Sequence, residues 1–459
     1  MRTAVAFCFV LCAAMPADAQ ENGDLDRIPQ AVQNEPAEPA APQSNAHGTY
    51  YAEDDFALSS ARGDLAVAVP PPTSSDWSNR TSLDAFDQWT LSERLSFTFS
   101  DRFSLTEADG IGFPAEASRN ALREAYFTWE PVTQTFVEFG RINLKNGIAL
   151  GFNPTDFFKA NTAVSQASAD PSTLRSDRLG TLMLRMQTIW DGGSATFVYA
   201  PKIHTPRQIV GADPGWIDPS FDQTNTTDRF MLALNLEVAD FSPQALIYHE
   251  SGRTKAGLNL SYPIGQSVIA YGEWAGGNAP DLIAEAIAFG KATGTLPAVA
   301  PVVPPTSASR AFQNDLAVGA SWTSEKKITL NLEYHFHQAG FTGADWRGWF
   351  DVGGANPALA PELWYVRGYA SAQQQPMSRH QIFLRADWQD AFVTDLELSG
   401  IAFVNLTDGS GMMQVAANYN LSDAWSLGAY AGGTFGGRRS EWGSLPNASS
   451  AIFQVVRYF

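Results

Sequence analysis

The segment EYHFH places three side chains suited to metal binding or acid–base chemistry at alternate positions. Glu333, His335 and His337 would share one face of an extended strand, on which next-but-one residues lie about 6.6 to 7 Å apart. Imidazole nitrogens bind zinc at about 2 Å, so these residues would need help from a neighbouring strand to share one ion. The sequence therefore predicts neither a metal site nor a cofactor. These three residues are only weak candidates for metal ligands.

Motifs for covalent or phosphate chemistry are missing from the sequence. It contains no G-x-S-x-G, H-E-x-x-H or P-loop segment, the patterns of a nucleophile elbow, a zinc peptidase and a phosphate cradle. Both cysteines, Cys8 and Cys12, lie in the apolar segment at the N-terminus. A chain that loses this segment has no disulfide, no thiolate metal site and no cysteine nucleophile. We predict no catalytic residues and no enzymatic activity.

The N-terminal segment has the pattern of a secretory signal peptide. Arg2 precedes an apolar run, and small residues follow at Ala17 and Ala19, as in a leader with an A-x-A cleavage site. The next segment is rich in Pro, Ala and Gln, and such a composition buries too little apolar surface to become ordered. We therefore expect a signal peptide over residues 1–20 and a linker, mostly disordered, over residues 21–88.

From about Trp89 to the C-terminus, apolar and polar residues alternate. In WTLSERLSFTFSDRFSL, Trp89, Leu95 and Phe103 share one parity, and the serines and arginines share the other. A period of two indicates a strand with one apolar and one polar face. The pattern recurs in segments of roughly ten residues that are joined alternately by short turns and long connections, as in transmembrane barrels. The sequence predicts an all-β fold over residues 89–459, a transmembrane antiparallel up-and-down β-barrel.

The alternating segments give about sixteen strands, an even number that places both ends of the barrel on one side of the membrane. The first is expected near residues 89–105 and the last over residues 450–459. Two earlier segments, SLDAFDQW and DLAVAV, raise the number to about eighteen if they are strands. Either number encloses a lumen wide enough for water.

Charge and aromatic placement limit the partners of the chain. The formal net charge is −18 and the pI is about 4.7, whereas nucleic-acid binding needs a basic face, so we expect no nucleic-acid partner. Trp129, Trp190, Trp322 and Trp425 stand at the ends of apolar faces. Aromatic residues at such positions form the interfacial girdles of membrane barrels, so lipid is an expected partner.

Two segments carry a resemblance to a known class of proteins. The last strand ends on Phe459 with Phe453 and Val455 on the same parity, which resembles the C-terminal aromatic signature of Gram-negative outer-membrane β-barrels, although Arg457 departs from it. FGRINLKNGIALGFNPTDFF, followed by RSDRLG, resembles a loop of porin-like and polysaccharide-export barrels. The resemblance implies an integral outer-membrane protein, with Phe459 read by the barrel-assembly machinery and the linker in the periplasm.

Residues on the polar parity would line the lumen, where charged side chains set selectivity. The candidates are Arg94, Arg102, Arg185, Arg229, Lys255 and Arg385 as cations, and Glu237, Glu273, Glu333, Asp387, Asp395 and Glu397 as anions. The long connection after residue 144 is the expected constriction, because a pair of phenylalanines is unfavourable on a solvated outer loop. Its candidate residues are Asn153, Pro154, Asp156, Phe157 and Phe158.

These features favour a porin-like channel for diffusion of small polar solutes or ions. A conduit for polysaccharide export and a channel for specific uptake of one small ligand are the alternatives, and an outer-membrane enzyme is a weaker one. The sequence leaves open the solute, the direction of transport and the choice between monomer and homotrimer.

Overall fold

The structure is a computed structural model that describes residues 48–70, 75–108, 118–206, 220–238, 241–306 and 309–459. The expected signal peptide and the part of the expected linker up to residue 47 lie outside these described residues.

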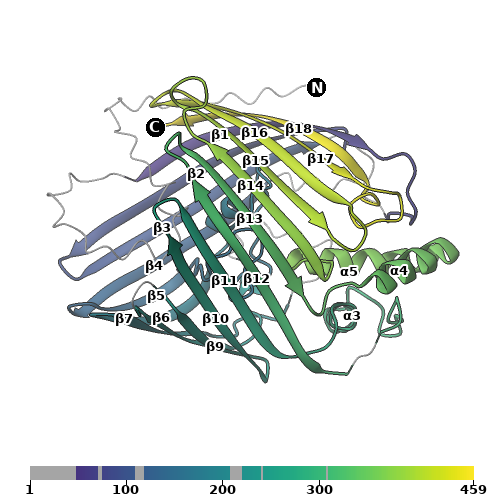
Figure 1. Cartoon of the computed structure of the whole chain (residues 1–459). Helices are drawn as coiled ribbons and strands as arrows, with labels where there is room; N and C mark the ends of the chain where they lie inside the picture. Colours follow the sequence, from purple (N-terminus) through teal and green to yellow (C-terminus); the bar gives the residue numbers. More distant parts are fainter. Residues whose placement is uncertain (1–47, 71–74, 109–117, 207–219, 239–240, 307–308) are drawn as a thin grey trace, which may run out of the picture.

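The described residues contain eighteen antiparallel strands that form one closed β-barrel (Figure 1). Each strand pairs with the next in the chain, and β18 pairs with β1 to close the ring. The strands are β1 (Thr49–Ala61), β2 (Trp77–Ser92), β3 (Leu95–Ala108), β4 (Arg119–Val132), β5 (Thr135–Ile142), β6 (Thr181–Trp190), β7 (Gly193–Ala200), β8 (Arg229–Leu236), β9 (Gln244–Glu250), β10 (Arg253–Ile264), β11 (Val268–Ala279), β12 (Ala311–Thr323), β13 (Ile328–His337), β14 (His380–Trp388), β15 (Leu396–Asn405), β16 (Gly411–Ser422), β17 (Trp425–Phe435) and β18 (Asn447–Tyr458).

The alternating residues of the sequence lie on the two opposite faces of the barrel wall. In β8, Phe230, Leu232 and Leu234 are exposed on the outside, whereas Met231 and Ala233 are buried inside. Successive side chains of a strand point to opposite faces of its sheet, and every strand of a closed ring therefore contributes to both an outer and an inner surface. The predicted all-β barrel is confirmed.

The expected number of sixteen strands is wrong, and the alternative of eighteen is right in number. SLDAFDQW lies within β2, but DLAVAV is not a strand, and the other additional strand is β1. The barrel therefore begins at Thr49, and residues 49–61 and 77–88 belong to its wall instead of to a disordered linker. The outward face of β1 carries Asp54 between apolar neighbours, so the strand does not show an uninterrupted apolar parity.

The turn between β2 and β3 explains why one expected strand spans two real segments. The register of this hairpin shifts between Thr90 and Ser92, which is a β-bulge. Because of the extra residue, Trp89 pairs with Phe97, and the apolar parity continues unbroken through the turn. The expected strand near residues 89–105 thus contains the end of β2 and most of β3.

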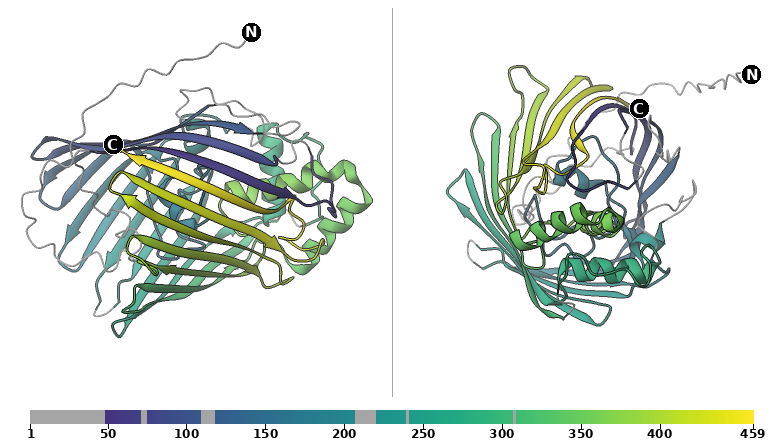
Figure 2. Two further views of the ribbon diagram at one scale, coloured as in Figure 1. Left: turned by 90° about the horizontal axis from the view of Figure 1, so that it is seen from above. Right: turned by 90° about the vertical axis from the view of Figure 1, so that its right-hand side faces the viewer.

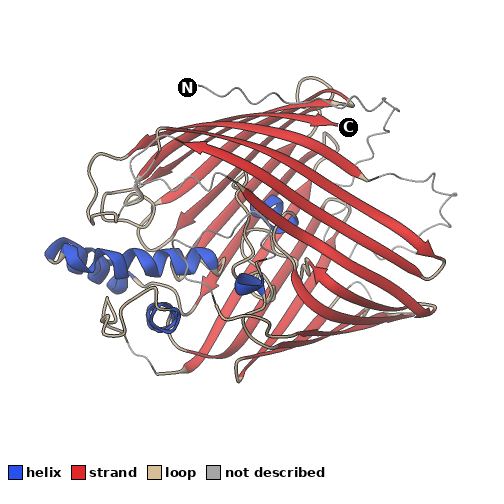
Figure 3. Cartoon of the chain, turned by 180° about the vertical axis from the view of Figure 1, so that it is seen from behind, coloured by secondary structure: helices blue, strands red, loops and turns tan. Residues whose placement is uncertain are grey.

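Helices from the long connections gather at one end of the ring. They are α3 (Leu282–Thr293), α4 (Gly343–Ala355), the 3₁₀ turn η2 (Pro357–Leu359) and α5 (Ala360–Ala372), and two shorter helices are α1 (Pro171–Ser176) and α2 (Phe221–Thr224). Figures 2 and 3 show helices inside the strand ring or at its end. No helix among the described residues is long and apolar enough to cross a membrane.

We call α3, α4 and α5 with their connecting residues the helical cap. Its buried apolar cluster includes Leu282, Trp349 and Val366, and Val67 from the β1–β2 connection joins it. A capping box begins α4, because the side chains of Thr342 and Asp345 bond each other's backbone N–H groups. The cap buries its own core and is therefore a small folded unit built on the long connections.

Candidate functional site

Residues 143–180, between β5 and β6, form the candidate site, and we call them the crossing loop. The loop contacts β9, β11 and β13 on one side of the lumen and β2, β3, β14 and β16 elsewhere on the ring, through the contacts described below. The loop therefore crosses the interior of the strand ring.

Glu273 of β11 holds the first part of the crossing loop. Its Oε2 accepts hydrogen bonds from the backbone N–H groups of Ile148 (3.0 Å) and Ala149 (3.1 Å). Its Oε1 accepts from the backbone N–H (2.7 Å) and the hydroxyl (2.8 Å) of Thr155. Glu273 is 1% exposed, so it acts as an anchor for the loop and not as a charge that faces a passing solute.

Glu333 of β13 is a second anchor, two strands away. Its carboxylate accepts from the backbone N–H groups of Leu150 (2.6 Å) and Gly151 (2.9 Å) and from the hydroxyl of Tyr271 (2.7 Å). The ring of His335 lies with Nε2 2.7 Å from the same carboxylate. A buried carboxylate with four partners is well compensated for its lost hydration.

The two phenylalanines of the loop pack on the wall at β9. The ring of Phe157 stacks on Tyr248 with centroids 4.5 Å apart, and Phe158 meets Tyr248 edge-on at 5.8 Å. Met231 and Leu246 complete this buried cluster on the inner face. The inner wall is apolar at this place, and the phenylalanine pair covers it, so the loop folds into the lumen.

Polar residues of the loop fix its internal conformation. Asp156 receives two hydrogen bonds from Arg178, at 2.8 and 3.1 Å, and the Asn153 side chain donates to the carbonyl of Ala149. Pro154 is buried beside them. These residues shape the loop, and none of them presents an open charge to the lumen.

The later part of the loop reaches the other strands of the ring. The Ser165 hydroxyl accepts from Arg80 (2.9 Å), and the Gln166 side chain accepts from Arg102 (3.3 Å). Asp170 accepts from Nε of Arg385 at 2.8 Å. The Gln414 side chain, from β16, bonds the backbone of Ala167 and Ala169.

The inner wall beside this part of the loop carries a paired set of charges. Asp84 lies 2.7 Å from Arg123 and 3.5 Å from Arg102, and Arg102 also contacts Glu53. Arg123 is in turn 3.1 Å from Asp177 of the loop. Each of these charges is paired with an opposite charge on a neighbouring strand or on the loop, so this part of the wall is not a surface of one sign.

The expected pore-lining residues fall into three groups. Those buried in contacts on the inner side are Arg102, Arg229, Glu273, Glu333, Arg385 and Asp387, and those half-buried on the inner face are Arg185, Lys255 and Glu397. Those exposed at the short-turn end are Arg94, Glu237 and Asp395. The residues of the last group have the inner parity but lie just beyond the ends of their strands. Strand parity therefore does not indicate whether they face the lumen.

Sequence reasoning missed the inner charges of the first two strands. Glu53 and Asp55 of β1 and Asp84 of β2 are buried on the inner side, and Arg80 of β2 is half-buried there. Their alternation was available in the sequence, but an expected barrel that began at residue 89 excluded them.

The three residues considered for metal binding have other partners. His335 contacts Glu333, whereas Nδ1 of His337 lies 2.6 Å from Oδ1 of Asp315. In the part of the chain that the structure describes, no three side chains of His, Cys, Asp or Glu converge on a common point.

Comparisons with known proteins show similarity in overall architecture only. No protein-family model matches the chain, and no curated protein matches it. Solved structures of similar shape include OccK11 (OpdR) of Pseudomonas aeruginosa, with 9% identity, a TM-score of 0.49 and coverage of 90% of this chain and 95% of that one. They also include OmpF of Salmonella typhi in complex with daunomycin, with 9% identity, a TM-score of 0.41 and coverage of 90% and 97%. A mutant porin of Rh. blastica has 10% identity, a TM-score of 0.40 and coverage of 90% and 99%.

Proposed function

We propose that this protein is an outer-membrane channel for small polar solutes or ions, with the crossing loop as its constriction. The observation that carries the proposal is the contrast between the two faces of one closed ring. Large apolar side chains are exposed on the outside, among them Phe127, Leu232 and Val415, whereas charged side chains and the crossing loop occupy the inside. An exposed apolar belt of this extent is stable in hydrocarbon and unfavourable in water.

The position of the tryptophans supports the membrane setting. Trp89, Trp129, Trp190, Trp322 and Trp425 are each at least 40% exposed and stand beside the short turns. Such a row of amphipathic rings matches the boundary between hydrocarbon and the polar head groups. Phe459 joins this end of the barrel, because its backbone N–H donates to the carbonyl of Tyr50 at 3.0 Å.

The lumen favours small polar solutes. The crossing loop narrows the passage, and the inner face carries half-buried charges of both signs, such as Lys255 and Glu397. A wall of mixed sign interacts with dipolar solutes at both of their ends, and it holds a simple anion or cation less well.

The experiment that tests this function is conductance across a planar bilayer with the refolded protein, together with liposome swelling across a size series of sugars and amino acids. The expected result is a steady ohmic conductance and a swelling rate that falls steeply with solute size. A folded barrel, identified by its heat-modifiable migration on a gel, that gives neither conductance nor swelling would overturn the proposal.

We also propose that the chain assembles as a homotrimer through the outer face of β1 and β2. Asp54 faces outward there and accepts from the side chains of Asn79 (2.9 Å) and Thr81 (2.7 Å). A carboxylate that faces hydrocarbon is unfavourable, and a second copy of the chain would shield it. Native mass spectrometry in detergent should give three times the mass of one chain for the wild type and a single chain for Asp54→Arg. A wild type that stays monomeric would contradict this assembly.

A further inference from the structure

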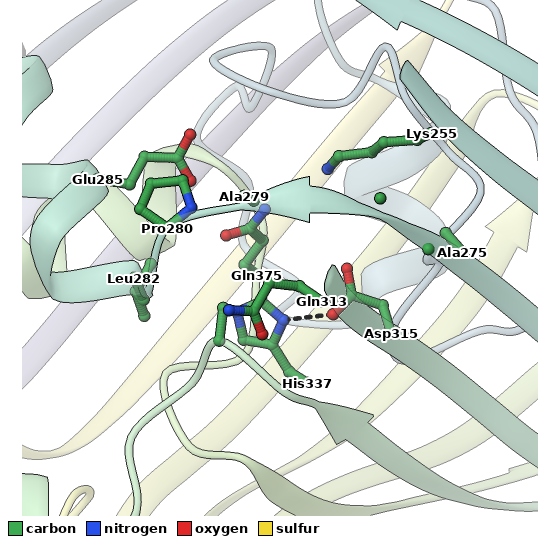
Figure 4. Close-up of a pocket in the computed structure, with 13 residues that line it drawn as sticks. Lys255, Ala275, Ala279, Pro280, Leu282, Glu285, Gln313, Asp315, His337 and Gln375 are labelled. Carbon is green, nitrogen blue, oxygen red and sulfur yellow. Dashed lines mark hydrogen bonds and ion pairs between the residues drawn. The ribbon is translucent and has the colours of Figure 1, made fainter. Parts of the chain in front are cut away.

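A small recess opens on the inner wall between strands β10 to β13 and the helical cap (Figure 4). Its volume is about 30 Å³, and its polar lining consists of Lys255, Glu285, Gln313, Asp315, His337 and Gln375. A cavity of 10 to 15 Å³ in this measure holds about one water-sized group. The recess therefore has room for a small polar group such as an ammonium, with the remainder of a solute in the lumen.

Two buried atoms of the lining have no hydrogen-bond partner among the described residues. Nδ1 of His337 faces the Asp315 carboxylate at 2.6 Å, and a carboxylate accepts, so we assign the ring proton to Nδ1; in this tautomer Nε2 is an acceptor. This Nε2 is unpartnered, and His337 is 3% exposed. The amide nitrogen of Gln313 donates to Asp281 (3.3 Å), and its Oε1 is left without a donor although Gln313 is 8% exposed.

Unpaired buried acceptors are rare in folded proteins, because each loses its hydration without compensation. A ligand that brings N–H or O–H hydrogens to Nε2 of His337 and Oε1 of Gln313 would restore both hydrogen bonds. The neighbouring Asp315 carboxylate adds a negative charge at this place, so a primary ammonium fits better than a neutral hydroxyl.

The opposite side of the recess is basic. Lys255 extends from β10 toward the recess (Figure 4), and no hydrogen bond or ion pair ties its ammonium to another described residue. Glu285 of α3 also lines the recess, but its carboxylate is paired with Arg253. Lys255 is thus the cation available to a ligand, and it would repel a simple cation that lacked a negative group.

We propose that this recess binds a small zwitterion that carries a primary ammonium and a carboxylate, as in an α-amino acid. The ammonium donates to His337 and Gln313 beside Asp315, and the carboxylate pairs with Lys255. The recess discriminates against simple anions through Asp315 and against simple cations through Lys255. Its role as a stage in solute passage rests on the proposed channel function.

Binding is tested directly with the full-length barrel refolded in detergent, by saturation-transfer NMR with glycine, acetate and methylammonium as probes. Glycine should bind at least about tenfold more tightly than either singly charged probe, because only glycine engages both sides of the recess. Lys255→Met and Gln313→Leu should each weaken glycine binding by about tenfold. Arg185→Met is the matched control, since Arg185 is a half-buried inner cation paired with Glu138 at 2.8 Å, away from the recess.

Equal binding of the three probes, or glycine binding that is unchanged in both Lys255→Met and Gln313→Leu, would overturn the proposal. Heat-modifiable migration verifies that each variant is folded. Conductance in potassium chloride, measured on the same preparations, separates the two conclusions. A barrel that conducts without binding glycine refutes the recess alone, and a barrel that binds glycine without conducting refutes the channel alone.

Discussion

Glu273→Gln should loosen the crossing loop and enlarge the passage. The carboxylate accepts two hydrogen bonds at each oxygen, all four from Ile148, Ala149 and Thr155. A glutamine keeps one accepting oxygen and turns an NH₂ group toward the donors at the other position. Hydrogen bonds to a charged group contribute about 1.5 to 3 kcal/mol each, so the loss of two weakens the docking of this segment by about 3 to 6 kcal/mol.

The assay is single-channel recording in a planar bilayer. Glu273→Gln should show a higher conductance than the wild type and larger fluctuations of the open-channel current, because residues 146–156 move against the wall. Glu138→Gln is the control, since Glu138 pairs with Arg185 on the inner face and, among the described residues, makes no hydrogen bond or ion pair with the crossing loop. If Glu273→Gln folds and its conductance and noise equal those of the wild type, the loop does not limit the passage.

A steric variant tests the same contact independently. A Cβ at Gly147 would lie 2.5 Å from Oε1 of Glu273, and the φ of Gly147 is +90°, which is unfavourable for other residues. Gly147→Ala should therefore reproduce the behaviour of Glu273→Gln while the carboxylate itself is kept. Agreement between the two variants would assign the effect to loop docking and not to the loss of a lumen charge.

The remaining predictions concern the cap and the C-terminus. Burial raises the pKa of Glu441, in the β17–β18 connection, from 4.5 to about 7, so the folded protein favours the protonated carboxyl group. The contribution of this group to the free energy of unfolding is therefore complete below pH 4.5 and is lost as the pH rises through about 7. The cap should lose about 3 kcal/mol between pH 4.5 and 8, measured by tryptophan fluorescence during denaturation, and Glu441→Gln should remove most of this dependence. An equal pH response in that variant would show that other groups cause it. Phe459→Ser should lower the yield of heat-modifiable barrel in the membrane fraction, and an undiminished yield would exclude Phe459 as an assembly signal.

Most strands from β3 onward could be predicted because each carries a largely apolar face, and a period of two has no other common explanation. Single polar residues on this face, such as Asn314 in β12 and Arg457 in β18, did not hide the pattern. The first two strands could not be recognised in the same way. Asp54 in β1 and Asn79 and Thr81 in β2 interrupt the outer face, and the bulge at Thr90–Ser92 carries the parity through a turn. The polar interruption that concealed these strands also distinguishes their outer face from the rest of the belt.

The sequence placed Glu273 and Glu333 on the inner face but gave no indication of what they bind. Their partners are backbone N–H groups of the crossing loop, and any residue other than proline can supply such a donor. Strand parity therefore predicts the direction of a side chain without the position of the loop that meets it. The helical cap did have local signals, the capping box at Thr342 and the glycine that ends α3 at Gly294, within segments that were expected only to be long connections.

The pairing of β18 with β1 has a consequence for the order of folding. Every other pair of neighbouring strands is consecutive in the chain, so those hairpins form between segments close in sequence. The closing pair joins segments on the order of 400 residues apart, and bringing such ends together costs roughly 5 kcal/mol of chain entropy. Until β18 is in place, β1 has an open edge that can pair with another chain. The pairing of β18 with β1 is therefore what protects the edge of β1 from aggregation.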